Sequence, residues 1–141
     1  MIISVTIDDF QSILKLYKQL WEKWNKFDEL KLREIFENDI KNKRKEYLIA
    51  KVENDVVGVC SVRFNDDWHY LKTATIDELI VNKDFRNRGI GRQLLDKACE
   101  VAREKGCYRI ELHSNIKRTV AHEFYEKYGF EKSSYYFKKK L

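Results

Sequence analysis

Proline is absent from the 141 residues, glycine occurs only five times and cysteine three times. Cys60, Cys99 and Cys107 form no CxxC pair, so we expect reduced thiols, no disulfide framework and no metal site. No apolar run approaches the roughly 18 residues that a membrane-spanning helix needs. The first ten residues lack the basic start and the long apolar stretch of a secretory signal. These absences favour a cytoplasmic protein without a membrane partner.

The sequence contains enough apolar side chains for a folded core. Hydrophobic residues make up 43% and aromatic residues 13%, which argues against disorder and for one domain over residues 1–141. Residues 1–70 carry 12 basic and 13 acidic side chains, whereas residues 71–141 carry 16 basic and 10 acidic ones. An anionic partner is therefore expected on the second half, either nucleic acid or a polyphosphate small molecule. Charge alone does not choose between them.

Hydrophobic periodicity predicts alternating strands and helices. The expected strands are Ile2–Thr6, 46–52, 56–64, Thr73–Val81, Tyr108–Leu112 and one within 133–141. Apolar residues at helical spacing predict four helices. One begins near Phe10, one follows a cap at Asp28, one runs from Ile90 to a stop at Gly106, and one runs through 118–128 before Gly129. This order predicts an α/β fold with a mixed sheet and helices packed on it.

A glycine turn between a strand and a helix is the most informative motif. Arg86-x-x-Gly89-x-Gly91 follows the strand that ends "DELIV" and opens the helix from Ile90. Free amides and the macrodipole at a helix N-terminus favour phosphate. The turn lacks the Gly-Lys-Ser/Thr of a P-loop, and Leu94 stands where a dinucleotide fingerprint needs its third glycine.

The turn resembles the acetyl-CoA pyrophosphate loop of the GNAT superfamily of N-acetyltransferases, which reads Q/R-x-x-G-x-G/A. The downstream "AHEFYEKYGF" arrives in the order of that superfamily, and "ELHSNIKRTVAHEFYEKYGFEKSSYYFKKKL" is similar to bacterial aminoalkylphosphonate N-acetyltransferases. The resemblance implies the GNAT acyl-CoA N-acyltransferase fold, with a mixed, mostly antiparallel sheet of six or seven strands flanked by about four helices. It also implies acetyl-CoA as acetyl donor and a homodimer as one possible assembly.

The resemblance further implies which residues meet the coenzyme. The pantetheine arm would lie along the backbone of Leu79, Ile80 and Val81. The pyrophosphate would be wrapped by Arg86, Asn87, Arg88, Gly89, Ile90, Gly91 and Arg92. Asn115, Arg118 and His122 complete the implied coenzyme contacts. Many members carry Asn where this chain has Arg118, so Arg118 is expected to meet a coenzyme phosphate or an anionic acceptor.

Two residues match the catalytic positions of the superfamily. Tyr125 falls on the tyrosine that protonates the departing sulfur, and Glu78 lies on the strand that often carries the base. Because side chains alternate along a strand, Asp77 and Glu78 are expected to face opposite sides. His113 and His122 remain alternative bases. No cysteine sits in a nucleophile motif, so direct attack of the amine is expected.

The acceptor is the least determined part. A small primary amine is favoured, including one that bears a phosphonate or carboxylate for Arg118 or Arg63 to bind. Aminoglycosides, polyamines and peptide amines are alternative acceptors. Residues expected to affect the choice are Tyr17, Trp21, Trp24, Arg33, Trp68, His69 and Tyr70. A non-catalytic acyl-CoA sensor is the alternative class. Nucleic-acid binding is disfavoured, because no recognition module is present and acids are interspersed with the bases.

Overall fold

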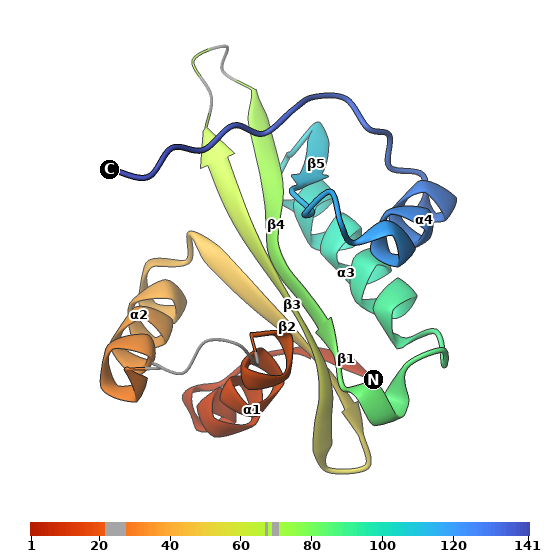
Figure 1. Cartoon of the computed structure of the whole chain (residues 1–141). Coiled ribbons are helices and arrows are strands. Elements are labelled where there is room, and N and C mark those ends of the chain that lie inside the picture. Colours follow the sequence, from red (N-terminus) through yellow and green to blue (C-terminus); the bar gives the residue numbers. More distant parts are fainter. Residues whose placement is uncertain (22–27, 67, 69–70) are drawn as a thin grey trace.

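The computed structural model describes residues 1–21, 28–66, 68 and 71–141. Over these residues the chain forms one five-stranded sheet in the order β1-β2-β3-β4-β5 and four α-helices (Figure 1). The strands are β1 (Ile2–Ser4), β2 (Lys45–Val52), β3 (Asp55–Asp66), β4 (Lys72–Val81) and β5 (Arg109–Leu112). The helices are α1 (Phe10–Leu20), α2 (Glu29–Asn42), α3 (Ile90–Glu104) and α4 (Thr119–Tyr128), with short 3-10 turns η1 (Ile7–Asp9) and η2 (Lys83–Phe85).

The sheet is mixed and mostly antiparallel, as the sequence predicted. β1 to β4 pair antiparallel in succession, and β5 pairs parallel with β4. α3 is the crossover that the parallel pair requires. The described residues contain five strands where six or seven were expected.

Helices cover both faces of the sheet, so each face has its own core (Figure 1). On one face, α3 buries Leu94, Leu95 and Ala98 against strand residues such as Val62 and Ile76. On the other face, α1 packs on β3 and β4, and α2 packs on β2. The second core joins Ile13 and Leu16 of α1 and Phe36 of α2 to Ile49 and Val59 of the strands.

The helices begin and end at the capping residues that the sequence predicts. Asp28 accepts a hydrogen bond from the Lys31 N–H at 3.1 Å and caps α2. Gly106 has φ +81° just after α3, and Gly129 has φ +120° just after α4, both in the region that favours glycine. No helix of the described residues is long and apolar enough to cross a membrane.

The predicted strand in the last segment is not formed. Residues 131–141, called here the C-terminal tail, adopt no regular structure, and their amides make no backbone hydrogen bond to a described residue. The tail runs from α4 across the top of the view in Figure 1. Its side chains Tyr135, Tyr136 and Phe137 are exposed. Strand propensity takes effect only where a partner edge and a buried face are available.

Candidate active site

A β-bulge in β4 places two carboxylates on one face of the sheet. Ser61 of β3 pairs with Glu78, but the next β3 residue pairs with Ile76, which leaves Asp77 as the extra residue. Ile76 and Leu79 both belong to the α3 core, so the alternation of side chains changes phase between them. The expectation that Asp77 and Glu78 face opposite sides is therefore wrong.

Glu78 is held by three residues, which come from α1, β2 and β3. Its Oε2 accepts hydrogen bonds from the hydroxyls of Tyr17, at 3.3 Å, and Ser61. The Lys45 ammonium lies 3.5 Å from the same oxygen. The Glu78 N–H in turn donates to the Ser61 Oγ at 3.1 Å. The Glu78 side chain is only 17% exposed, so its carboxylate is fixed and desolvated on most sides.

Asp77 joins two cations that come from different strands. Arg63 of β3 donates through Nε and Nη2 to both Asp77 oxygens, at 3.2 and 3.0 Å. Lys45 of β2 lies 3.3 Å from Asp77 Oδ2. Burial raises the pKa of the Asp77 carboxyl, but the hydrogen bond from Arg63 and the charges of Lys45 and Arg63 outweigh it and leave the pKa below its usual value.

β4 and the edge strand β5 separate beyond Ile76. β4 pairs with β5 only through 73–76, opposite 109–112. In the part of the chain that the structure describes, no strand pairs with the rest of β4, Leu79, Ile80 and Val81, on its β5 side. An extended ligand can therefore add to this edge through main-chain hydrogen bonds.

The loop after β4 presents a run of amides. Among the described residues, none of the N–H groups from Arg86 to Arg92 donates to a protein acceptor, and the first such bond of α3 runs from Gln93 N–H to Gly89 O at 3.0 Å. Asn87 has φ +61° and Gly89 has φ +78°. Successive backbone N–H groups in a turn of this kind can form an anion-binding concavity.

Two arginines of this loop are tied back to its own backbone. Arg86 Nε donates to the Val81 carbonyl at 3.1 Å, and Arg88 Nη2 donates to the Asp84 carbonyl at 3.2 Å. The Arg88 guanidinium also lies 5.0 Å from the centre of the Phe85 ring. These contacts orient both side chains while leaving donors exposed, which suits a doubly charged pyrophosphate.

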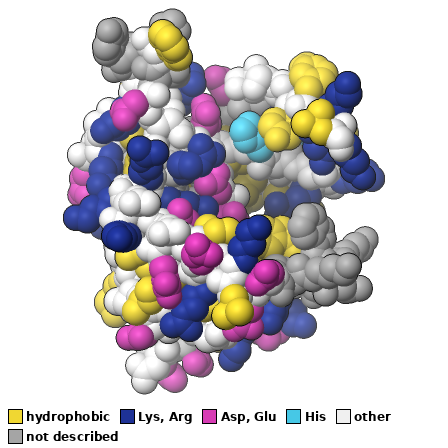
Figure 2. All heavy atoms as spheres, turned by 90° about the vertical axis from the view of Figure 1, so that its left-hand side faces the viewer, with side chains coloured by type: hydrophobic (Ala, Val, Ile, Leu, Met, Phe, Trp, Pro, Cys, Tyr) yellow, Lys and Arg dark blue, Asp and Glu magenta, His cyan; other side chains and the backbone are white. Residues whose placement is uncertain are grey.

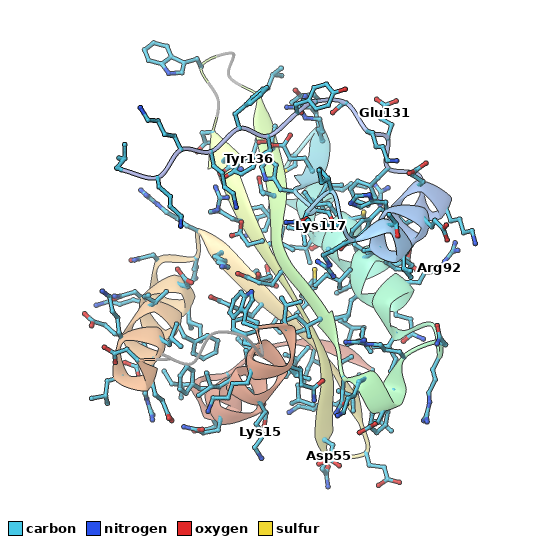
Figure 3. The ribbon with its side chains drawn as sticks, viewed as in Figure 1. Lys15, Asp55, Arg92, Lys117, Glu131 and Tyr136 are labelled. Atoms are coloured by element: carbon cyan, nitrogen blue, oxygen red, sulfur yellow. The ribbon has the colours of Figure 1, made fainter. Side chains whose placement is uncertain are left out.

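Helix α4 packs closely against the start of α3. A Cβ on Gly91 would lie 3.3 Å from Cζ of Phe124, so a larger residue would push α4 away. Arg92 lies over the ring of Tyr128 at 5.9 Å, and Figure 3 shows Arg92 on the side of α3 that faces α4. The loop, the free edge of β4 and α4 therefore border one region that offers main-chain hydrogen-bond donors.

Tyr125 faces the core side of α4. Its ring packs between Phe124 and Phe130, with centroids 5.6 and 5.9 Å away, and it borders the α3 core. Burial raises the pKa of the Tyr125 phenol, and the nearby charge of Arg118 only partly offsets this. Its hydroxyl has no hydrogen-bond partner among the described residues, so it is available to a ligand as a neutral donor.

The segment before α4 is braced by its own groups. Asn115 Oδ1 accepts from the Lys117 N–H at 2.9 Å, and the Asn115 carbonyl accepts from the Arg118 N–H at 3.0 Å. The His122 Nε2 lies 2.9 Å from the same carbonyl. The residue at the N-cap of α4 is Arg118, so Asn115 is not the helix cap. His122 ties α4 to this segment.

The structure brings some predicted residues together and leaves others apart. Glu78 faces α1, whereas Tyr125 lies on the α3 side. Cys60 of β3 interacts electrostatically with both of them. His113 is exposed and contacts the Tyr136 ring at 4.8 Å. Trp24, His69 and Tyr70, expected near the acceptor, lie outside the described residues.

Sequence reasoning missed the partners of the two carboxylates. The sequence predicts Tyr17 only as a residue that affects the choice of acceptor, and it predicts no role for Ser61 or Lys45. Ser61 could have been found by placing β3 opposite β4, because the two strands are joined by a short connection. Lys45 could not, since its contact depends on the bulge at Asp77.

The same chain matches known proteins over most of its length. The model of the acetyltransferase (GNAT) family matches residues 10–130. The chain is 34% identical to the aminoalkylphosphonate N-acetyltransferase of Salmonella typhimurium, over 96% of this chain and 88% of that protein. It is 32% identical to an uncharacterised N-acetyltransferase of Methanocaldococcus jannaschii, over 91% of this chain, and spans 59% of that longer relative.

The fold also matches that of a solved structure. A crystal structure titled as a transcriptional regulator from Bacillus halodurans superimposes with a TM-score of 0.91, at 27% identity, and covers 100% of this chain and 99% of its own. The fold and the superfamily expected from the sequence are confirmed. Because the family model covers residues 10–130 and a relative is 34% identical over nearly the whole chain, the chain belongs to the acetyltransferase (GNAT) family.

Proposed function

We propose that the protein transfers the acetyl group of acetyl-CoA to the primary amine of a small molecule. The observation that carries this proposal is the free edge of β4 leading directly into the unpartnered amides from Arg86 to Arg92. A ligand that hydrogen-bonds along a strand and ends in a pyrophosphate satisfies both features together.

The coenzyme contacts follow from these two features. Leu79, Ile80 and Val81 would offer main-chain groups to the pantetheine arm. The loop amides, with the side chains of Arg86, Arg88 and Arg92, would hold the phosphates. Arg118 is exposed, and Asn115 and His122 fix the segment that carries it. We propose that this segment meets the distal part of the coenzyme.

Acetyl-CoA, when bound, supplies a thioester whose C–S bond breaks as the new N–C bond forms. Glu78 accepts the proton that the attacking amine releases, directly or through a water. The Tyr125 hydroxyl donates a proton to the departing sulfur; the raised pKa of its phenol keeps that proton in place near neutrality. This assignment takes Glu78 as base because its carboxylate is fixed at the β4 bulge, whereas His122 is occupied by the Asn115 carbonyl.

The three cysteines support direct transfer without an acetyl-enzyme. Cys60 is fully buried, and burial raises the pKa of its thiol far above the ordinary value. Burial also raises the pKa of Cys107. Cys99 lies 3.6 Å from the Tyr128 hydroxyl, away from Tyr125. Because a thiolate is the reactive form, Cys60 and Cys107 are poorly suited to carry the acetyl group.

A second candidate is an acyl-CoA-binding regulator without turnover. It is favoured by the similarity to the Bacillus halodurans protein, which is titled a transcriptional regulator. The fixed Glu78 and the available Tyr125 hydroxyl argue for catalysis, since a sensor has no use for a proton donor beside the coenzyme sulfur.

A thiol-release assay with purified protein, acetyl-CoA and a panel of primary amines tests the proposal. We expect release above the amine-free blank for at least one small amine, with an intersecting, sequential kinetic pattern. Acetyl-CoA binding without release for any amine, including peptide and aminoglycoside amines, would support the regulator instead. Parallel lines in the double-reciprocal plot would contradict direct transfer.

A further inference from the structure

The cluster around Asp77 and Glu78 has a charge pattern that points to one class of acceptor. It contains two cations, Lys45 and Arg63, and two carboxylates, Asp77 and Glu78. Asp77 is engaged by both cations at 3.3 Å or less. Lys45, Asp77 and Arg63 together therefore carry one net positive charge, and the Glu78 carboxylate next to them balances it.

This inference rests on the proposed acetyl transfer. We propose that Arg63, supported by Lys45, binds the anionic group of a short zwitterionic acceptor, while Glu78 faces the acceptor's amine. Asp77 is then a positioning residue for both cations. An amine that carries a phosphonate or carboxylate meets an opposite charge at each end, and the sum of charges in the cluster stays at zero.

The fixed orientation and the remaining donors of the Arg63 guanidinium suit the binding of an anion. Asp77 fixes its Nε and Nη2, and Asn65 accepts from its Nη1 at 2.9 Å. Asn65 is itself fixed by donating to the Thr75 hydroxyl at 2.9 Å. A guanidinium has five N–H donors, so two remain, and the side chain is 47% exposed. Its orientation is set before any ligand arrives, which lowers the entropic cost of binding.

The distance along the sheet between Arg63 and Glu78 favours a short acceptor. Arg63 stands opposite Thr75, and Glu78 stands opposite Ser61. Two residues of strand correspond to about 7 Å, and the Arg63 side chain leans back toward Asp77. An acceptor therefore needs only a few atoms between its nitrogen and its acidic group to reach both residues.

Groups from α1 and β5 surround this cluster. α1 bounds the cluster through Tyr17, which donates to Glu78. Beyond Asp77, the neighbouring strand presents Arg109 and Glu111, paired at 3.1 Å and about half exposed. Figure 2, which views the molecule from the α2 side, shows basic and acidic side chains interspersed on this face. A polycation would therefore meet Lys45, Arg63 and Arg109 together with the carboxylates.

The test compares acceptors of equal length that differ only at the far end. 2-Aminoethylphosphonate and β-alanine carry an anion, propylamine carries none and 1,3-diaminopropane carries a second cation. With saturating acetyl-CoA, we expect a lower KM for one or both anionic acceptors than for propylamine, and the highest KM for the diamine. The phosphonate and carboxylate arms tell which anion is preferred. Equal KM values for all four, or a preference for the diamine, would overturn the proposal.

Variants assign the effect to Arg63. Losing a hydrogen-bonded charge costs about 1.5–3 kcal/mol, or roughly 10- to 100-fold in affinity. Arg63→Met should raise the KM for the anionic acceptors by that factor and should change the KM for propylamine much less. Arg63→Lys should restore part of the loss. Arg103→Met, which removes an exposed arginine from α3, is the matched control and should change neither. An unchanged KM for the anionic acceptors in Arg63→Met would overturn the proposal.

A binding measurement separates this inference from the proposed function. In the presence of CoA, calorimetry should detect 2-aminoethylphosphonate or β-alanine binding to the wild type and weaker binding to Arg63→Met. Such binding without thiol release from any amine would contradict the transferase function and leave the subsite standing. Neither binding nor release would overturn both.

Discussion

At the scale of single residues, the hydroxyl of Tyr125 is the group whose removal discriminates catalysis from binding. Tyr125→Phe keeps the ring contacts with Phe124 and Phe130 and removes only the proton donor. General acid catalysis contributes typically 10²–10⁴-fold, so we expect kcat to fall by about 100-fold or more. Tyr135→Phe, in the exposed tail, is the control. Stabilisation by acetyl-CoA should be the same in both variants; a Tyr125→Phe enzyme with wild-type kcat would remove this residue from the mechanism.

Asp77 should make a pH-dependent contribution to folding stability. Its folded-state pKa lies below the ordinary value of 3.8, so the unfolded state binds a proton more readily. The stabilisation is fully present above about pH 5 and is lost as the pH falls through the lowered folded pKa. Arg63 and Lys45 cause the shift, and Glu78 is the other charged group beside them. Asp77→Asn removes the titrating group.

Denaturant unfolding of wild type and Asp77→Asn at a series of pH values measures this contribution. The difference in unfolding free energy should be constant between pH 5 and 7 and should shrink below about pH 4. A difference that stays constant down to pH 3 would show that Asp77 titrates alike in the folded and unfolded states.

At the scale of elements, the turn between η2 and α3 depends on backbone that most residues avoid. Gly89 has φ +78°, and no atom lies within 4 Å of the place a Cβ would take. The cost of a substitution is therefore conformational, about 1–2 kcal/mol for alanine in the left-handed region. Gly89→Asn should cost less, since asparagine tolerates that region. Chemical denaturation compares the two, and equal stability of the alanine and asparagine variants would contradict this explanation.

The elements predicted well from sequence are those that local chemistry specifies. The helix from Ile90 to Gly106 has an apolar stripe, a glycine-rich start and a glycine stop, and the structure has α3 at Ile90–Glu104. The turn from Arg86 to Gly91 lies between β4 and the body of α3, where the motif predicts it. None of these needs knowledge of a distant partner.

The elements predicted poorly are those whose structure depends on pairing with another strand. The tail reads as a strand, but forming one needs a partner edge along its length, and residues 131–141 adopt no regular structure. The β4 bulge is likewise invisible in one sequence, because an extra residue shows only against the register of β3. Because Asp77 is the extra residue, its side chain lies on the same face of the sheet as that of Glu78, and this changes the predicted site.

At the scale of the whole molecule, the basic second half of the chain contains the loop that we propose to bind the coenzyme phosphates. Arg86, Arg88 and Arg92 are exposed and lie in the basic half of the chain. Figure 3 shows that Lys117 also lies in the part of the molecule that holds β5 and α4. The half that binds the proposed polyphosphate therefore carries the excess charge, whereas the half with α1 and α2 is nearly balanced.

Thermal unfolding with acetyl-CoA tests this explanation for the whole molecule. A ligand at 100 times its Kd adds about 2.7 kcal/mol, and an unfolding entropy of roughly 0.3 kcal/mol/K for a chain of this length converts it to about 9 °C in Tm. Because exposed charges are screened over about 10 Å at 0.1 M salt and 3 Å at 1 M, the shift at fixed acetyl-CoA should shrink at high salt. A paired Arg86→Met and Arg88→Met variant should show a smaller shift and a weaker salt dependence. ATP and a short DNA duplex are the controls, and an equal rise in Tm with DNA would mean that the basic half serves nucleic acid instead.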